Sequence, residues 1–174
     1  MQQIIRTKRL ILRPFSLKDA PRVVGLVGNE LIAEMTSNIP YPYTESDAVT
    51  WISTHNDSFY QRKAIVYAIT QTDTGELIGA VSLPKLCDGF GVLGYWLGVD
   101  YWGNGFATEA SRALVAYCKQ HLGLKRLQVM HYAENNRSKS VINKLGVQYI
   151  GNRFSRIKGQ ERELYVYESE LQFT

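Results

Sequence analysis

The stretch Gly94-Tyr-Trp-Leu-Gly-Val-Asp-Tyr-Trp-Gly-Asn-Gly-Phe-Ala-Thr-Glu109 decides how this chain of 174 residues is interpreted. Its pattern is that of a strand, a glycine-rich turn and the start of a helix in direct succession. At such a junction the first amides of the helix have no intrahelical partners, and the helix dipole favours an anion. Gly103 and Gly105 allow a close approach to the backbone. The stretch is therefore typical of a phosphate-binding turn.

Two common phosphate-binding motifs are excluded by the residues that follow the turn. A P-loop requires Lys and then Ser or Thr after its last glycine, whereas this chain has Phe106 and Ala107 there. A dinucleotide-binding fingerprint requires a third Gly or Ala where Thr108 stands. It also requires an acidic residue at a strand end about 20 positions further on, which the chain lacks. The turn therefore predicts a phosphate site of another kind.

The composition places the chain among ordinary globular proteins. Hydrophobic residues make up 45% and charged residues 21%, which argues against a disordered, collagen-like or membrane-embedded chain. No apolar run approaches the ~20 residues that span a bilayer, and the first residues do not form a signal peptide. Cys87 and Cys118 are far apart in sequence, which favours neither a disulfide framework nor a zinc site. We expect a single domain over residues 1–174 and a cytoplasmic location.

Positive charge is concentrated in one third of the chain. The whole sequence has 20 Lys and Arg against 16 Asp and Glu, a net charge of +4. Between Lys119 and Arg162 there are ten basic and two acidic residues, a local balance of +8 that leaves −4 for the remainder. Such a block suits an anionic partner, either nucleic acid or a phosphorylated small molecule. No RNA-binding or helix-turn-helix pattern supports the nucleic-acid alternative.

Hydrophobic periodicity and turn residues predict strands that first pair as hairpins and then alternate with helices. Strands are expected over Arg9–Phe15, Ala64–Thr70, Leu77–Leu83, Gly91–Val99, Leu127–His131, Val147–Phe154 and Leu164–Phe173. Helices are expected from Ser16 to about Val27, from Thr44 to about Phe59, from Gly105 to His121 and from Ser138 to Leu145. This order predicts an α/β fold with one mixed sheet.

Three motifs together resemble the GNAT superfamily of N-acetyltransferases. Trp102-Gly-Asn-Gly-Phe-Ala-Thr-Glu-Ala110 resembles its acetyl-CoA pyrophosphate loop. Thr7-Lys-Arg-Leu-Ile-Leu-Arg-Pro-Phe15 and Asn135-Asn-Arg-Ser-Lys-Ser-Val-Ile-Asn-Lys-Leu-Gly-Val147 resemble the opening strand and the Asn-x-x-Ser segment of its RimJ/RimL branch. Tyr95-Trp96 and Tyr101-Trp-Gly103 are also similar to that branch, which acetylates protein N-terminal amines. The resemblance covers nearly the whole chain in order.

The resemblance implies a GNAT fold with acetyl-CoA as co-substrate and no metal. This is a single mixed, mostly antiparallel sheet of about seven strands with about four helices, splayed between strands four and five. Those strands would be Gly91–Val99 and Leu127–His131. The implied cofactor-binding residues are Leu97, Gly98, Val99, Trp102, Gly103, Asn104, Gly105, Phe106, Ala107, Thr108, Asn135, Ser138 and Lys144. Asn135 is also a candidate helix N-cap, and both roles can coexist.

Direct transfer of acetyl to an amine requires no enzyme nucleophile, so both cysteines are free to be structural. Many relatives protonate the leaving thiolate with a Tyr, at a position where this chain has Ile142. The alternative is Ser138, which as a weak acid is better suited to a hydrogen bond to the sulfur than to outright protonation. Glu163 and His131 are both candidate general bases.

The acceptor is expected opposite the cofactor, beside the first two helices and the loop between them. Candidate lining aromatics are Tyr41, Tyr43, Trp51, Tyr60 and Tyr67, and Glu30 and Glu34 are candidates to attract a cationic amine. The resemblance implies that a protein N-terminal α-amine is acetylated. A small amine (polyamine, aminoglycoside or amino acid) and a non-catalytic module that binds CoA or associates with the ribosome or RNA remain alternatives. The protein is expected to be a monomer or a homodimer.

Overall fold

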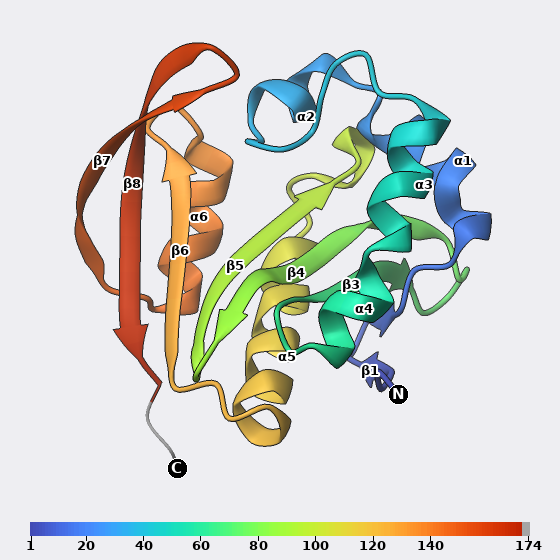
Figure 1. Ribbon diagram of the computed structural model, residues 1–174, viewed down its shortest axis with the longest axis horizontal. Helices are drawn as coiled ribbons and strands as arrows, with labels where there is room; N and C mark the ends of the chain where they lie inside the picture. Colours follow the sequence, from blue (N-terminus) through green and yellow to red (C-terminus); the bar gives the residue numbers. More distant parts are fainter. Residues whose placement is uncertain (172–174) are drawn as a thin grey trace.

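The computed structural model describes residues 1–171, in which eight strands form one sheet in the order β1-β2-β3-β4-β5-β6-β8-β7 (Figure 1). The strands are β1 (Ile5–Arg6), β2 (Leu10–Arg13), β3 (Ile65–Gln71), β4 (Leu77–Cys87), β5 (Phe90–Leu97), β6 (Arg126–Tyr132), β7 (Tyr149–Ile157) and β8 (Gln160–Glu170). All neighbouring pairs are antiparallel except β5 and β6, which are parallel. This is the mixed, mostly antiparallel sheet that the sequence predicts.

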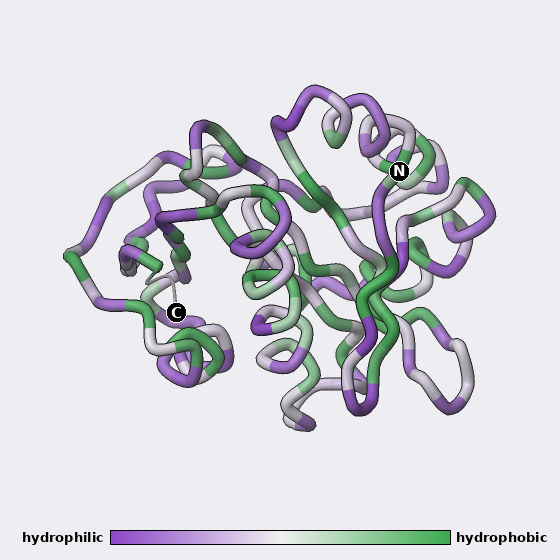
Figure 2. The backbone as a smooth tube through the Cα atoms, turned by 90° about the horizontal axis from the view of Figure 1, so that it is seen from below, coloured by the Kyte–Doolittle hydropathy of each residue, from purple (hydrophilic) through white to green (hydrophobic). Residues whose placement is uncertain are grey.

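Helices cover both faces of the sheet (Figure 1). In the described residues they are α1 (Ala20–Val27), α2 (Glu30–Glu34), α3 (Glu45–Ser53), α4 (His55–Tyr60), α5 (Phe106–His121) and α6 (Asn136–Leu145). In the view of Figure 1, α3 and α4 lie in front of the sheet, and α5 and α6 lie behind it. Figure 2 shows that hydrophobic segments gather towards the interior, whereas hydrophilic segments follow many of the outer turns.

The count of elements in residues 1–171 exceeds the expected seven strands and four helices. The extra strand is β1, only two residues long and thus too short to show a periodic pattern. One extra helix is α2, which begins where the Asn29 side chain accepts a hydrogen bond from the Leu31 amide. The other arises because the helix predicted from Thr44 onward is two helices, α3 and α4.

The break between α3 and α4 has a local cause in two hydroxyl side chains. The Ser53 hydroxyl donates to the Val49 carbonyl at 2.7 Å, and the Thr54 hydroxyl donates to the Trp51 carbonyl at 2.7 Å. The Thr54 amide also bonds to Trp51, three residues back, rather than four. Such back-bonding by Ser and Thr competes with the helical ladder and bends helices. The apolar spacing on either side does not reveal it.

Strand β4 continues past the predicted end at Leu83 and carries a bulge. Ser82 lies opposite Gly94 and Lys85 opposite Val92, so Leu83 and Pro84 together face one residue of β5. Proline cannot donate to the ladder, and a bulge bends the strand and increases its twist. The strand therefore accommodates Pro84 because its register with β5 is irregular at this point.

Strands β5 and β6 separate beyond the bulge. Their pairing runs from Phe90 opposite Arg126 to Leu93 opposite Val129, and ends there. β5 continues to Leu97 and β6 to Tyr132 without pairing to one another (Figure 1). The expected splay between Gly91–Val99 and Leu127–His131 is confirmed, and β1 shifts these strands from fourth and fifth to fifth and sixth.

The remaining predicted elements agree with the structure to within a few residues. α5 buries Ala107, Ala110, Leu114 and Cys118 against the sheet. α6 ends at Gly146, whose φ of +73° is the left-handed conformation that closes helices. The predicted last strand begins four residues earlier, at Gln160, and its expected end at Phe173 lies outside the described residues. No helix in residues 1–171 is long and apolar enough to cross a membrane.

His55 makes stability depend on pH. It is 8% exposed, packs edge-on against Phe15 and Trp51, and neither ring nitrogen has a hydrogen-bond partner among the described residues. Burial lowers the pKa of His55 to about 4. Between pH 6.5 and 4 the unfolded chain binds a proton at this residue that the folded chain does not, so stability falls as the pH drops through that window.

We therefore expect His55→Phe to remove part of the acid sensitivity. As the pH is lowered from 7 to 4, wild type should lose more stability than the variant. The difference between their free energies of unfolding should change by at most about 3 kcal/mol over this range. His121→Gln, a change at the exposed end of α5, serves as the control and should follow wild type. Parallel pH profiles for wild type and His55→Phe would contradict the assignment.

Candidate active site

A cavity of about 870 Å³ opens where β5 and β6 separate. Residues of both strands line it, including Leu93, Tyr95 and Met130. The start of α5 and the face of α6 close one side, and α1, α3 and the segment 35–40 close the other. The cavity thus runs from a helix N-terminus, through the gap in the sheet, to the helices on the opposite face.

The glycine turn meets this cavity at the start of α5. Gly103 and Gly105 have φ of +80° and +79°, a region that favours glycine. A Cβ on Gly103 would have no atom within 4 Å, and one on Gly105 would approach only the Arg9 guanidinium, at 3.4 Å. The first residues of α5, Phe106, Ala107 and Thr108, all line the cavity. Their amides belong to the helix end that lacks intrahelical acceptors, which is suited to bind an anion.

The turn is braced from the amino-terminal strand. Arg9 donates to the Asn104 carbonyl at 2.8 Å and to the Glu109 carboxylate at 2.9 Å, and its guanidinium lies 4.5 Å from the centre of the Phe106 ring. The Thr7 hydroxyl donates to the same carboxylate at 2.6 Å. Residues about a hundred positions apart in sequence thus hold the conformation of the turn.

Glu109 stays ionised within this brace. Partial burial acts to raise its pKa, but the hydrogen bonds from Thr7 and Arg9 and the charge of Arg9 outweigh burial, so the pKa of Glu109 lies below its usual value. Its contribution to stability is present above the carboxyl's ordinary pKa and is lost as the pH falls through the lowered one. At neutral pH the brace is therefore intact.

The start of α6 faces β5 across the gap. The Asn135 side chain caps the helix by accepting from the Ser138 amide at 3.1 Å. The Ser138 hydroxyl lies 2.6 Å from the hydroxyl of Tyr95, which projects from β5. Burial raises the pKa of Tyr95 to about 12, although the hydrogen bond with Ser138 acts to lower it. Tyr95 is accordingly a neutral phenol at physiological pH.

Trp102 and Arg137 also meet at the cavity. The Trp102 indole donates to the Leu97 carbonyl at 3.0 Å, which fixes the turn against the end of β5. The Arg137 guanidinium lies 3.6 Å from the Trp102 ring centre, a close cation–π contact. This contact places a positive charge from α6 beside the glycine turn.

Most of the cofactor-binding residues expected from the sequence come together here. Those that line the cavity are Leu97, Trp102, Gly103, Gly105, Phe106, Ala107, Thr108, Asn135, Ser138 and Lys144. Gly98, Val99 and Asn104 are not among the lining residues. Gly98 donates its amide to the Ile78 carbonyl, and the carbonyls of Gly98 and Val99 accept from Tyr101 and Trp102 in a short 3₁₀ turn.

The three candidate catalytic residues occupy different environments. Ser138 and His131 line the cavity, but both ring nitrogens of His131 are engaged, Nδ1 with the Tyr132 carbonyl at 2.7 Å and Nε2 with the Tyr167 hydroxyl at 3.1 Å. Glu163 does not line the cavity, and its carboxylate accepts from Asn152 on β7 at 2.6 Å. Neither candidate base is thus a free group facing the gap.

On the opposite side, Tyr43 and Trp51 line the cavity as expected, whereas Tyr41, Tyr60 and Tyr67 do not. Glu30 and Glu34 are also absent from its lining. Asp47 is the only carboxylate that lines the cavity within the described residues, and hydrogen bonds from Thr44 hold its pKa below the usual value. The rest of this wall combines aliphatic side chains, such as those of Val23, Val27 and Ile32, with uncharged polar ones at Thr36, Ser37 and Asn38.

Sequence reasoning missed two contributors to the site. Tyr95 stands in a quoted motif, but nothing in its spacing indicates that it reaches a serine on another element. Arg9 occupies an exposed position on the opening strand, and its contact with Asn104 and Glu109 arises only from the fold. Neither cysteine contributes to the cavity: Cys87 is exposed, and burial raises the pKa of Cys118 to about 12. Residues 1–171 contain no cluster of acidic, His or Cys side chains able to hold a metal.

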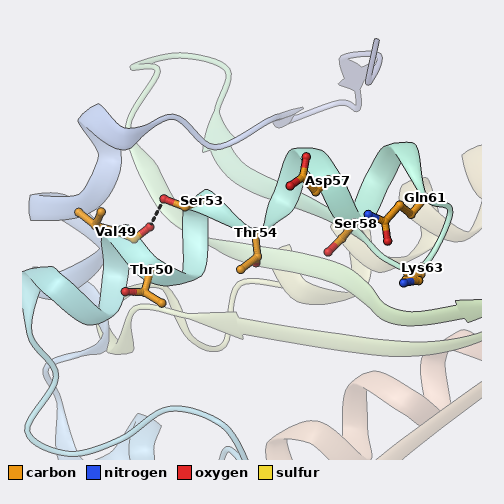
Figure 3. Close-up of a pocket in the computed structure, with 8 residues that line it drawn as sticks. All are labelled: Val49, Thr50, Ser53, Thr54, Asp57, Ser58, Gln61 and Lys63. Carbon is orange, nitrogen blue, oxygen red and sulfur yellow. Dashed lines mark hydrogen bonds between the residues drawn. The ribbon is translucent and has the colours of Figure 1, made fainter.

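A second hollow follows the outer side of α3 and α4 (Figure 3). It is lined by Val49, Thr50, Ser53, Thr54, Asp57, Ser58, Gln61 and Lys63. Figure 3 shows the Ser53 hydroxyl bound back to its own helix. This groove has neither a glycine turn nor the start of a long helix. The larger cavity is therefore the candidate active site.

Comparison with known proteins identifies the chain. Residues 9–148 match the family model of the acetyltransferase (GNAT) domain. The chain belongs to the GNAT family. It is also 30% identical, over 155 residues, to the uncharacterized N-acetyltransferase YoaA of Bacillus subtilis (strain 168), a match that covers 87% of this chain and 86% of YoaA.

Solved structures of GNAT proteins share the fold. The ribosomal L7/L12 α-N-protein acetyltransferase RimL, in complex with coenzyme A, superposes with a TM-score of 0.87 at 17% identity, covering 97% of this chain and 98% of RimL. The microcin C7 self-immunity acetyltransferase MccE, in complex with acetyl-CoA and AMP, gives 0.86 at 19% identity, covering 95% and 94%. The resemblance to the GNAT family is confirmed. The protein is an acetyl-CoA-dependent N-acetyltransferase.

The brace on the glycine turn can be tested with Arg9→Gln. Loss of the contacts to Asn104, Glu109 and Phe106 should lower the free energy of unfolding by about 1 kcal/mol and weaken acetyl-CoA binding, because the turn loses its support. Denaturant unfolding and calorimetric titration measure both quantities. Lys8→Gln, at the exposed neighbouring position, is the control. Equal Kd values for the two variants would show that the turn does not depend on Arg9.

Proposed function

We propose that this enzyme transfers the acetyl group of acetyl-CoA to a primary amine, and that this amine is the α-amine of a protein N-terminus. Acetyl-CoA would lie in the gap between β5 and β6, with its pyrophosphate at the start of α5. The observation that carries this proposal is the continuous cavity, which joins the glycine turn, the gap in the sheet and the carboxylate-bearing side near α3. Cofactor and amine can thus approach from opposite faces of the sheet.

The backbone of β5 favours pairing with the cofactor's amide groups at Tyr95–Leu97. The Gly98 amide bonds to Ile78 of β4, and peptide groups alternate in direction along an antiparallel pair. The peptide groups of Tyr95 and Leu97 therefore point towards the gap. The Leu97 carbonyl accepts a hydrogen bond from the Trp102 indole. The groups left to pair with the cofactor are the Leu97 amide and the amide and carbonyl of Tyr95. Gly98 and Val99, satisfied within the 3₁₀ turn, are less suited to this role.

Charge on the cofactor side suits an anionic ligand. Arg137 and Lys144 of α6 line the cavity beside the glycine turn, and α6 carries no acidic residue. They belong to the basic block between Lys119 and Arg162, so the block supports a nucleotide cofactor. Cations and a helix N-terminus together stabilise phosphate groups. The cofactor-binding roles of Gly103–Thr108 and Lys144 are proposed on this ground.

The other side of the cavity suits an acceptor with one positive charge. Asp47 is its only carboxylate among the described residues, so this wall offers a single negative charge. A polyamine or an aminoglycoside carries several charges that would remain unpaired against such a wall. A single α-amine pairs with one carboxylate. RimL, whose fold this chain shares, is named for acting on the α-amine of a ribosomal protein.

The engagement of both candidate general bases with other groups also favours an amine of low pKa. His131 is held at both nitrogens, and Glu163 bonds to Asn152 outside the cavity. An α-amine has an ordinary pKa of about 7.7–8.0 and is partly neutral at pH 7, whereas a lysine amine near 10.4 is not. The neutral amine can attack the thioester carbon and release its proton to water. Ser138 would then hydrogen-bond to the departing thiolate.

One observation favours a small amine as the second candidate. The Lys158 ammonium, at the tip of the β7–β8 hairpin, donates to the carbonyls of Ala33 in α2 at 2.7 Å and of Ile39, and so ties the hairpin to α2 and to the segment after it. Figure 1 shows this hairpin reaching towards α2. A tie at this edge of the cavity restricts access for a bulky acceptor. A protein N-terminus would have to enter as an extended segment.

A thiol-release screen distinguishes these acceptors. Acetyl-CoA is offered with short peptides bearing a free N-terminus, their N-terminally blocked lysine counterparts, polyamines, aminoglycosides and amino acids. We expect kcat/KM for the free N-terminal peptides to exceed that for the blocked lysine peptides by at least tenfold near pH 7.5, because of amine ionisation. Turnover confined to polyamines or aminoglycosides would reject the proposed acceptor. Tight CoA binding without turnover of any amine would indicate a binding module.

The pyrophosphate site is tested with Gly105→Glu and its matched control Gly105→Ala. Both replace a glycine at φ +79°, so both carry the same backbone cost. Only the glutamate adds negative charge at the start of α5, where it opposes an anionic ligand. We expect the glutamate variant to bind acetyl-CoA at least tenfold more weakly than the alanine variant in calorimetry. Equal affinities of the two folded variants for acetyl-CoA would show that the pyrophosphate does not bind beside Gly105.

A further inference from the structure

A contact between two hydroxyl side chains joins β5 to α6 at the cavity. The Tyr95 hydroxyl of β5 lies 2.6 Å from the Ser138 hydroxyl of α6 and 3.4 Å from the Ser138 carbonyl. Both residues line the cavity. The shorter distance is that of a well-formed O–H···O hydrogen bond. The hydroxyl pair thus lies where the proposed cofactor passes between the strands.

The direction of this hydrogen bond decides what Ser138 can do. A hydroxyl has one proton to donate and lone pairs to accept. If Ser138 donated to Tyr95, it would offer only a lone pair to a neighbouring sulfur. A phenol is far more acidic than an aliphatic alcohol and is therefore the better donor of the two. Burial keeps Tyr95 protonated, since its pKa is about 12. Donation from Tyr95 to the Ser138 hydroxyl would leave the Ser138 proton free for a neighbouring sulfur.

The resemblance implies that Ile142 stands where many relatives carry a tyrosine, and this side chain has no hydroxyl and is fully buried in the core. Asn135 fixes the backbone of Ser138 by accepting from its amide. Ser138 is thus held at two points, by Asn135 through its amide and by Tyr95 through its hydroxyl. The remaining freedom of the side chain is the direction of one O–H bond, and Tyr95 sets it.

We propose that Tyr95 is a positioning residue for the departure of CoA, because it turns the Ser138 hydroxyl into a hydrogen-bond donor towards the sulfur. This rests on the proposed function, which places the sulfur beside Ser138. As the amine nitrogen bonds to the carbonyl carbon, the carbon–sulfur bond breaks and its electron pair leaves with the sulfur. Ser138 donates a hydrogen bond to the thiolate, Tyr95 donates one to Ser138, and both keep their protons. The amine's proton passes to water, and the thiolate takes one from water.

The first test measures ionisation of the CoA thiol in the bound state. CoA is titrated with pH on wild type, Tyr95→Phe and Ser138→Ala, and the ultraviolet absorbance of the thiolate is followed. The pair stabilises the thiolate, so we expect the bound thiol to ionise at lower pH in wild type than in either variant. Tyr117→Phe, which removes a partly buried phenolic hydroxyl on α5 outside the cavity, is the control and should match wild type.

The second test asks whether Tyr95 acts through Ser138. Tyr95→Phe should lower kcat about tenfold, with little change in the Kd of acetyl-CoA, because a hydrogen bond to a charged group is lost in the transition state. In the Ser138→Ala background the same change should have no further effect. A purely structural tyrosine would lower kcat equally in both backgrounds and would lower the melting temperature as well.

The outcomes separate this inference from the function on which it rests. Failure of wild type to bind CoA would overturn both. If CoA binds and both variants ionise its thiol as wild type does, the positioning role is wrong and the binding site stands. If equal losses of kcat occur in the two backgrounds, Tyr95 does not act through Ser138. Should one single variant fail to fold, the other breaks the same hydrogen bond and completes the thiol titration.

Discussion

The interruption of the sheet at Leu93 is the constraint on which the site depends. Pairing between β5 and β6 ends at this residue, and the bulge at Leu83–Pro84 of β4 lies opposite it. A bulge bends and twists its strand, so β5 is turned away from β6 at the point where their ladder stops. Beyond Leu93, β5 remains paired with β4, but its peptide groups on the side of β6 are left without a partner strand. This gap between β5 and β6 is the proposed site for acetyl-CoA.

The elements around the gap are held by contacts between distant parts of the chain. Arg9 and Thr7 bind Glu109 and support the glycine turn, and Arg137 stacks on Trp102. Tyr95 contacts Ser138, and Lys158 ties the last hairpin to α2 and to the segment after it. Each contact joins elements that flank the cavity, so the site is preorganised by the fold instead of by one loop. Such preorganisation lowers the cost of fixing cofactor and amine together.

Local sequence patterns predict the helices and strands that are long and regular. α5 begins at Phe106, directly after the predicted glycine, because a left-handed glycine closes the turn there. Patterns fail where a tertiary contact or a side chain overrides them: Pro84 argues for a strand end, yet β4 absorbs it in a bulge, and the hydroxyls of Ser53 and Thr54 divide a helix that apolar spacing presents as continuous. At the site, the glycine turn is visible in the sequence, whereas the Tyr95–Ser138 and Arg9–Glu109 contacts depend on how strands and helices are placed in space.

Hydrogen–deuterium exchange with and without acetyl-CoA locates the cofactor on the protein, since it reports on individual backbone amides. The account predicts that acetyl-CoA slows exchange at the amides of Tyr95 and Leu97 on β5, as an added strand would, and at Phe106, Ala107 and Thr108 at the start of α5. The groove along α3 and α4 should be unaffected. Protection confined to that groove, or no protection at β5 under saturating acetyl-CoA, would contradict the assignment of the gap in the sheet as the cofactor site.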